Sequence, residues 1–225
     1  MEISCNNGRS FVFSPNKTAL LVIDMQRDFC CQGGYGYLAG GDVRPLQSII
    51  PRIREVLDTA RSLGLLIVHT REGHLPDLSD CPQAKQERSR YAGAEIGAKG
   101  PLGRFLIRGE FGHDFVNELT PLPGELVIDK PGFGAFYKTN LENLLEERGI
   151  THLIFTGVTT EVCVHSTLRE AVDRGFYCLL LEDCCAAYDR ELHQAAVRMI
   201  ESEGGIFGWV SRAEEFLKAI SSLKK

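Results

Sequence analysis

The sequence predicts an α/β protein built on a doubly wound, mostly parallel sheet with helices on both faces. Short apolar runs of strand length alternate along the chain with segments whose apolar residues recur every three or four positions. Because each helix carries the chain back to the start of the next strand, the strands are expected to run parallel. The first run, 18–24 (TALLVID), is apolar up to a final carboxylate, which is typical of a strand buried on both faces.

The later strands and helices are expected from the same two patterns. Further apolar runs predict strands at 65–70 (LLIVHT), 125–129 (ELVID), 151–156 (THLIFT), 176–182 (FYCLLLE) and 206–207 (IF). Helix-period segments predict helices at 43–63, 139–149, 160–174, 189–203 and 212–223. Glycines at 64, 149 and 175 end three of these helices, and TNLE at 139–142 is a capping box that opens one of them.

One long stretch, 71–124, lacks both patterns. It holds five of the nine prolines of the chain, and a structureless stretch of this length is usually a lid, a binding loop or an oligomer contact. We therefore expect a single domain over 1–225 with a long loop insertion at about 71–124.

Composition excludes several classes of protein. With 225 residues, 44% hydrophobic and 24% charged, the chain is neither disordered nor fibrous. Its net charge is −5 and no dense Lys/Arg cluster is present, so we expect neither nucleic acid nor a membrane as a partner. No apolar run approaches the roughly 18 residues of a membrane span, and the opening MEISCNNGRS does not resemble a signal peptide. A cytoplasmic protein is expected.

Eight cysteines are present, too few for a disulfide scaffold in a chain of this length. No C-x-x-C occurs, and the close pairs, Cys30–Cys31 and Cys184–Cys185, are adjacent residues that rarely converge on one zinc ion. Most of the eight are therefore expected to be small buried residues, and one or two at most to carry chemistry.

Polar residues follow three of the expected strands, where ligands bind in parallel sheets. Asp24 follows the first strand, Lys130 follows ELVID, and Thr156 leads into Cys163 in the first turn of the next helix. A helix N-terminus and a nearby lysine both lower the pKa of a thiol, and a carboxylate can carry its proton. A cysteine nucleophile is one hypothesis, and three unconnected structural residues are the other.

The segments LLVIDMQRDF, DKPGFGAFYKTNL and FTGVTTEVCVHSTLREAVDRGF resemble the isochorismatase-like cysteine hydrolases, in the order of that superfamily and over about 15–210. The resemblance implies an amide-cleaving triad of Asp24, Lys130 and Cys163. It also implies a cis peptide bond between Val158 and Thr159, with the amides of Thr159 and Cys163 as the oxyanion hole. A homo-oligomer, either a tetramer or a dimer, is expected.

The segments TREGHLPDLSDCP, GRFLIRGEFGHD and GGIFGWV look most like biuret hydrolases. We therefore expect hydrolysis of the terminal carbamoyl C–N bond of a linear urea, of the biuret or triuret type, with release of ammonia. Gln26, Arg71 and Glu203 are the candidate substrate-binding residues. Glu203 is chosen because, at the end of the helix 189–203, its carboxylate could turn back towards the strand ends and accept N–H groups of a longer urea.

Three alternatives stay open. The substrate could be ureidoacrylate or an N-carbamoylsarcosine-type compound, the domain could be a catalytically silent binding module, or an adjacent cysteine pair could serve thiol redox chemistry. No cofactor is expected. Nicotinamidases carry Asp-x-His and a further histidine for a metal, whereas this chain has Glu72 and His74 without an obvious second histidine, so no metal site is predicted.

Overall fold

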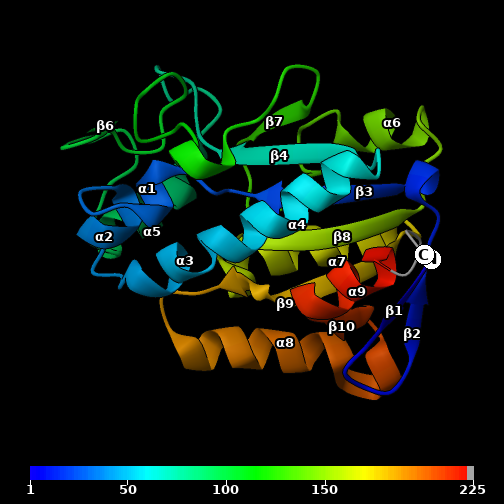
Figure 1. Cartoon of the computed structure of the whole chain (residues 1–225). Coiled ribbons are helices and arrows are strands. Elements are labelled where there is room, and N and C mark those ends of the chain that lie inside the picture. Colours follow the sequence, from blue (N-terminus) through cyan, green and yellow to red (C-terminus); the bar gives the residue numbers. More distant parts are fainter. Residues whose placement is uncertain (222–225) are drawn as a thin grey trace.

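A computed structural model describes residues 1–221, and its centre is a six-stranded sheet (Figure 1). All neighbouring strands are parallel, in the order β10–β9–β8–β3–β4–β7. The strands are β3 (Thr18–Ile23), β4 (Leu66–Glu72), β7 (Leu126–Lys130), β8 (His152–Val158), β9 (Tyr177–Ala186) and β10 (Trp209–Ser211). The predicted fold class is confirmed.

The strand order reverses between β3 and β8. From β3 the chain adds β4 and then β7 on one side, after which it returns to the centre and adds β8, β9 and β10 on the other. At such a switch point the connections leave the sheet in opposite directions, so a crevice forms beyond the carboxyl ends of the two central strands. The segments after β3 and after β8 therefore border the expected site.

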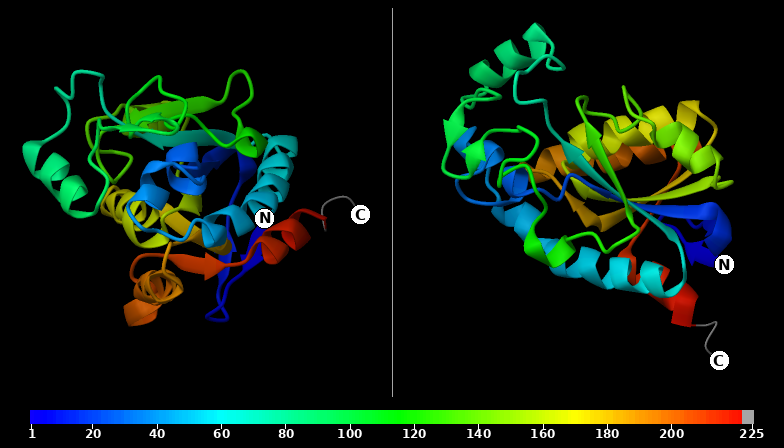
Figure 2. Two further views of the ribbon diagram at one scale, coloured as in Figure 1. Left: turned by 90° about the vertical axis from the view of Figure 1, so that its left-hand side faces the viewer. Right: turned by 90° about the horizontal axis from the view of Figure 1, so that it is seen from above.

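Helices cover both faces of the sheet (Figure 2). In β3, Leu20 and Val22 pack on one face, while Leu21 and Ile23 pack on the other. The first face is covered by α3 (Arg44–Ser48), α4 (Ile50–Ser62) and α9 (Ala213–Ser221), and the second by α6 (Leu141–Glu146), α7 (His165–Asp173) and α8 (Arg190–Gly205). This two-sided burial explains why the strands are almost wholly apolar. Among residues 1–221, no helix is both long and apolar enough to cross a membrane.

The helix expected at 43–63 is two helices, α3 and α4, which meet at Ile49. Pro51 stands in the first turn of α4. Because proline has no N–H and its ring clashes with the carbonyl four residues before it, the helix restarts there. The apolar periodicity continues across the break, which is why it suggested one helix.

The insertion is more regular than expected. The strand β4 extends through Glu72, beyond the predicted end at Thr70, and the following segment contains a nine-residue helix, α5 (Gln83–Tyr91). Helix α5 has little apolar periodicity because it packs through few residues, so the sequence pattern did not reveal it. The insertion also holds β5 (Lys99–Gly100), β6 (Gly103–Arg104) and a 3₁₀ turn (Asn117–Leu119).

Short elements complete the described chain. The N-terminus forms a hairpin of β1 (Glu2–Ser4) and β2 (Ser10–Val12), followed by a 3₁₀ turn (Pro15–Lys17), and two short helices, α1 (Arg27–Cys30) and α2 (Tyr35–Leu38), follow β3. The strand expected at 206–207 lies instead at β10, because Gly204, Gly205 and Gly208 take positive φ values that keep the chain out of an extended conformation before it enters the sheet. The predicted helix 212–223 is observed as α9, and residues 222–223 lie outside the described residues.

Candidate active site

Asp24 and Lys130 form a buried ion pair at the carboxyl ends of β3 and β7. Lys130 Nζ lies 2.7 Å from Asp24 Oδ2, and both side chains are inaccessible to solvent. Asp24 is held from the other side by Thr70 of β4, whose hydroxyl donates to Asp24 Oδ1 at 2.5 Å. The remaining N–H groups of Lys130 reach the carbonyls of Gly132 (3.1 Å) and Phe133 (2.9 Å). Both charged groups are thus fixed in place before any ligand arrives.

Cys163 lies in a single π-helical turn, 160–164, that connects β8 to α7. The peptide bond between Val158 and Thr159 is cis, as the resemblance implies. The carbonyl of Thr159 accepts from the N–H groups of Val162 and Val164, which closes the turn and aims the thiol of Cys163 at the end of β3. Thr156, in contrast, is not at the strand end: its hydroxyl donates to the carbonyl of Leu21 inside the sheet.

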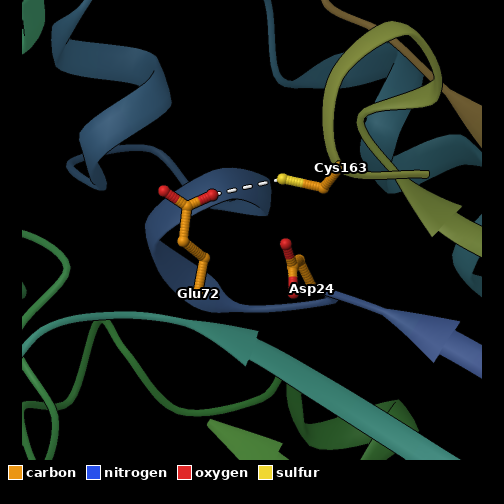
Figure 3. Close-up of side chains that lie close together, drawn as sticks. All are labelled: Asp24, Glu72 and Cys163. Atoms are coloured by element: carbon orange, nitrogen blue, oxygen red, sulfur yellow. Dashed lines mark hydrogen bonds between the residues drawn. The ribbon is translucent and has the colours of Figure 1, made fainter. Parts of the chain in front are cut away.

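Glu72, the last residue of β4, lies at the site although the sequence analysis did not place it there. Its Oε2 accepts from Cys163 Sγ at 3.2 Å (Figure 3), and its Oε1 lies 2.6 Å from Lys85 Nζ of α5. Glu72 is opposite Lys130 in the β4–β7 register. Since side chains alternate along a strand, Thr70 and Glu72 share the side of β4 that faces the site. Glu72 lies two residues after Thr70, so the sequence places both on one side of the strand. Which side faces the site is known only from the pairing of β4 with its neighbours.

The four charged groups divide into two carboxylates and two lysines. Burial raises the pKa of Asp24 above its usual range, and Glu72 adds to the rise while Lys130 opposes it. Burial acts on Glu72 in the same way, but Lys85 and Lys130 outweigh it and the pKa of Glu72 is lowered. Lys130 is buried, yet Asp24, Cys163 and Glu72 raise its pKa. Glu72 is thus the more firmly ionised carboxylate, and Asp24 the more ready proton acceptor.

The thiol of Cys163 differs from the expectation. Burial raises its pKa well above the ordinary value, and Asp24 and Glu72 reinforce this against the opposing effect of Lys130. Burial, together with the two carboxylates, disfavours the thiolate more than Lys130 favours it. These effects favour the thiol form of Cys163 over the thiolate.

A cavity of about 310 Å³ opens onto Cys163. Of the three triad residues only Cys163 lines it, because Asp24 and Lys130 lie behind the thiol. The cavity is lined by Glu72, Lys85, Arg88, Ser89, Thr159 and Glu161 among polar residues, and by Phe29, Tyr35, Ala92, Ile96, Phe133, Val162 and Tyr188 among the others. A larger groove of about 700 Å³ between Arg27 and Arg54 contains none of these reactive groups.

Gln26 and Arg71 do not reach this cavity, which corrects their assignment as substrate-binding residues. The Gln26 amide is buried and clamps the backbone of Glu72: its Nε2 donates to the Glu72 carbonyl at 2.9 Å, and its Oε1 accepts from the Glu72 N–H at 2.7 Å. Arg71 points to the other side of β4, where its guanidinium binds Asp129 at 2.7 Å. The physical reason is the strand alternation that turns Arg71 away when Glu72 faces the site.

Glu203 lies at the opposite edge of the sheet, a further correction. It is exposed, and the next carbonyl, of Gly204, accepts from Arg9 in the β1–β2 hairpin. Helix α8 starts after the carboxyl end of β9 and runs back along the sheet to the start of β10. A helix rises about 1.5 Å per residue, so the dozen residues from Arg190 onwards carry Glu203 roughly 18 Å away from the strand ends.

The residues at the site do not fit a metal ion. Asp24, Glu72 and Cys163 bring potential ligand atoms within 4.8 Å of one another. Each carboxylate already has a lysine at 2.6–2.7 Å, so a divalent cation would meet two ammonium groups as well as the ligands. His74, the candidate from the nicotinamidase-like spacing, binds Asp80 through Nδ1. We derive no step through a metal.

The adjacent cysteine pairs do not form redox sites. Cys184 and Cys185 are neighbours in β9, and their side chains enter the two different cores on opposite faces of the sheet. Burial raises the pKa of both thiols far above the ordinary value. In the other pair, burial likewise raises the pKa of Cys30 and of Cys31. None of these thiols has the lowered pKa that thiol exchange requires.

Comparisons with known proteins find relatives in both sequence and fold. The isochorismatase domain model matches residues 18–215. The ureidoacrylate amidohydrolase RutB of Klebsiella variicola (strain At-22) is 37% identical over 216 residues, which is 94% of this chain and 90% of that protein. The structure of a cysteine hydrolase from Pseudomonas syringae pv. phaseolicola 1448A has a TM-score of 0.80 at 24% identity, covering 94% of this chain and 96% of that one. An N-carbamoylsarcosine amidase from Thermoplasma acidophilum has a TM-score of 0.65 at 24% identity, covering 88% and 96%.

Proposed function

Because this chain belongs to the isochorismatase family and is a hydrolase of amide C–N bonds, we propose that it cleaves the terminal carbamoyl group of a ureido substrate through an acyl-enzyme on Cys163. The observation that carries the proposal is the juxtaposition of the Cys163 thiol with a buried carboxylate–lysine pair at the floor of a cavity. A nucleophile, a proton carrier and a fixed cation are the parts that acyl transfer needs.

The chemical steps follow from the order of these groups. The sulfur of Cys163 bonds to the carbamoyl carbon while its proton passes to Asp24, and the backbone amides of Thr159 and Cys163 stabilise the tetrahedral oxyanion. The C–N bond then breaks, and Asp24 returns the proton to the leaving ammonia. Lys130 holds Asp24 in position and offsets the charge of the site throughout.

Hydrolysis of the acyl-enzyme uses the same groups again. A water molecule attacks the thioester carbon and gives a proton to Asp24. The C–S bond breaks, the proton returns to the sulfur of Cys163, and the product leaves as an N-carboxylated amine. The thiol of Cys163 is thereby restored.

Among ureido compounds we place ureido carboxylic acids, such as ureidoacrylate or an N-carbamoyl amino acid, ahead of biuret and triuret. The 37% identity to a ureidoacrylate amidohydrolase supports this order. Arg88 of α5 lines the cavity with an exposed guanidinium that has no ion-pair partner within residues 1–221. Such a guanidinium suits a carboxylate at the far end of the substrate, and the aromatic walls suit a short hydrocarbon between the two polar ends.

Biuret or triuret is the second candidate, for one specific reason. Glu161, also on the cavity wall, has a buried Oε2 without a hydrogen-bond partner among the described residues. An unengaged carboxylate oxygen accepts N–H groups, which a urea oligomer carries along its whole length.

A substrate panel separates the candidates. Ammonia release is measured for ureidoacrylate, N-carbamoylsarcosine, biuret, triuret and nicotinamide, with Cys163→Ser as the blank. We expect kcat/KM for a ureido acid to exceed that for biuret by at least about 10-fold, the selectivity of one matched polar contact. A preference for biuret or triuret would reverse the order, and no cleavage of any ureido compound would overturn the proposed function.

A further inference from the structure

The cavity contains a carboxylate that the triad chemistry leaves without a role. We propose that Glu72 binds an N–H group of the substrate's carbamoyl group, and that Lys85 of α5 is the residue that positions it; this inference rests on the proposed ureido substrate. Asp24 takes the proton of Cys163, whereas Glu72 binds the carbamoyl group that Cys163 attacks.

The position of Glu72 fits this role better than that of Asp24. Glu72 lines the cavity, while Asp24 lies behind the thiol with no exposure at all. Glu72 Oε2 lies 3.2 Å from Cys163 Sγ. A carbamoyl carbon in position for attack lies about 3–3.5 Å from the sulfur, which allows one of its nitrogens to come within hydrogen-bond distance of Glu72 Oε2. Each carboxylate oxygen has two lone pairs, and Oε2 can therefore exchange the thiol for an N–H donor as the sulfur loses its proton.

Both the backbone and the side chain of Glu72 are fixed by other residues, more than balancing a nearby positive charge would require. Gln26 binds both its backbone N–H and its backbone carbonyl. Lys85 binds Oε1 at 2.6 Å, which leaves Oε2 turned towards Cys163. Lys85 is itself fixed, because its Nζ donates to the carbonyl of Pro131 at 2.7 Å and lies 4.9 Å from the centre of the Phe133 ring.

A purely structural role would not require this ion pair. Buried ion pairs add little to stability compared with apolar residues of the same volume, because desolvation costs nearly as much as the attraction returns. Lys130 already has Asp24 as its partner, so it does not need Glu72 at 3.8 Å to balance its charge. A preorganised acceptor that faces the cavity gives the pair a function.

Helix α5 connects the insertion to the chemistry through this pair. Lys85, Arg88 and Ser89 all come from α5 and line the same cavity. The insertion thus supplies one wall of the site. From the sequence alone it was expected to be a lid, a binding loop or an oligomer contact. The position of the Glu72 carboxylate therefore depends on whether α5 is packed against the site.

Two substrates distinguish the role of Glu72 from that of Asp24. The probes are a hydrolysed ureido compound from the panel and p-nitrophenyl acetate, an ester without N–H groups that acylates Cys163; Cys163→Ser supplies the background of the other thiols. For Glu72→Gln, we expect kcat/KM for the ureido compound to fall about 10- to 100-fold further than acylation by the ester, since a neutral amide replaces the charged acceptor of the hydrogen bond. For Asp24→Asn, the matched control, both rates should fall together, because both reactions need the thiol proton removed.

The positioning role of Lys85 is tested by combining its substitution with that of Glu72. Lys85→Met alone should lower the ureido rate, whereas the double variant Glu72→Gln/Lys85→Met should be no slower than Glu72→Gln alone, because a positioning residue acts only through its partner. The double variant removes both charges, so it keeps the test valid if Glu72→Gln leaves an unpaired lysine and folds poorly.

The outcomes separate this inference from the proposed function. Equal losses on ester and ureido substrates in Glu72→Gln would overturn the role of Glu72, as would wild-type rates on both. Additive effects of the two substitutions would overturn the positioning role of Lys85. If the wild-type protein cleaves no ureido compound but is acylated by the ester, the proposed substrate class fails instead.

Discussion

Replacing Lys130 by methionine tests the buried ion pair at the centre of the site. Methionine has nearly the length of lysine without the charge, so Asp24 would lose an ammonium group at 2.7 Å while remaining inaccessible to water. Removing one partner of a buried pair costs about 3–5 kcal/mol. The total free energy of unfolding of a typical domain is about 5–15 kcal/mol, so the loss should be large and measurable.

The size of this loss should depend on pH. Without Lys130, the pKa of Asp24, already raised in the wild-type protein by burial, rises further. A carboxyl group with a raised pKa in the folded state contributes stability below the pKa of the unfolded chain, and this contribution is lost as the pH rises through the folded-state value. The deficit of Lys130→Met should therefore be small near pH 4 and grow towards pH 8, by at most about 1.4 kcal/mol per pH unit for each group.

Urea denaturation of both proteins between pH 4 and pH 8 measures the deficit, and ammonia release measures activity. The matched control is the double variant Asp24→Asn/Lys130→Met, which removes both charges. It should recover most of the stability and none of the activity, because the proton carrier is gone. A deficit that is the same at every pH, or a double variant as unstable as Lys130→Met, would refute the electrostatic reasoning.

Three further predictions concern the thiol, the metal and the cavity mouth. Cys163→Ser should keep the fold and lower turnover by several orders of magnitude, since a hydroxyl ionises far less readily than a thiol; one tenth of the wild-type turnover would exclude Cys163 as the nucleophile. Dialysis against a chelator should leave ammonia release intact, and full inhibition that added zinc or iron reverses would contradict this. In Arg88→Met, the ratio of kcat/KM for a ureido acid to that for biuret should fall at least about 10-fold, and an unchanged ratio would remove Arg88 from carboxylate binding.

The sequence by itself determined the fold class and the strand ends that carry Asp24 and Lys130. Strands buried on both faces must be almost wholly apolar, so TALLVID and THLIFT could be recognised as strands without a structure. Parallel strands end at one edge of the sheet, so a shared site for Asp24, Lys130 and Cys163 was one of two hypotheses, and the resemblance to the isochorismatase-like cysteine hydrolases favoured it. The structure brings Asp24 and Lys130 beside Cys163.

Tertiary structure alone decided which other residues reach the cavity. Arg71 and Glu72 are adjacent, and only the register of β4 against β7 shows which of them faces the site. Lys85 comes from an insertion whose docking depends on contacts distant in sequence, such as that with Pro131. Glu203 lies at the wrong edge because α8 runs back along the sheet. Local sequence patterns specify a helix or strand and its buried face. Long-range packing decides which strand residues face the site, where an insertion packs and in which direction a helix runs.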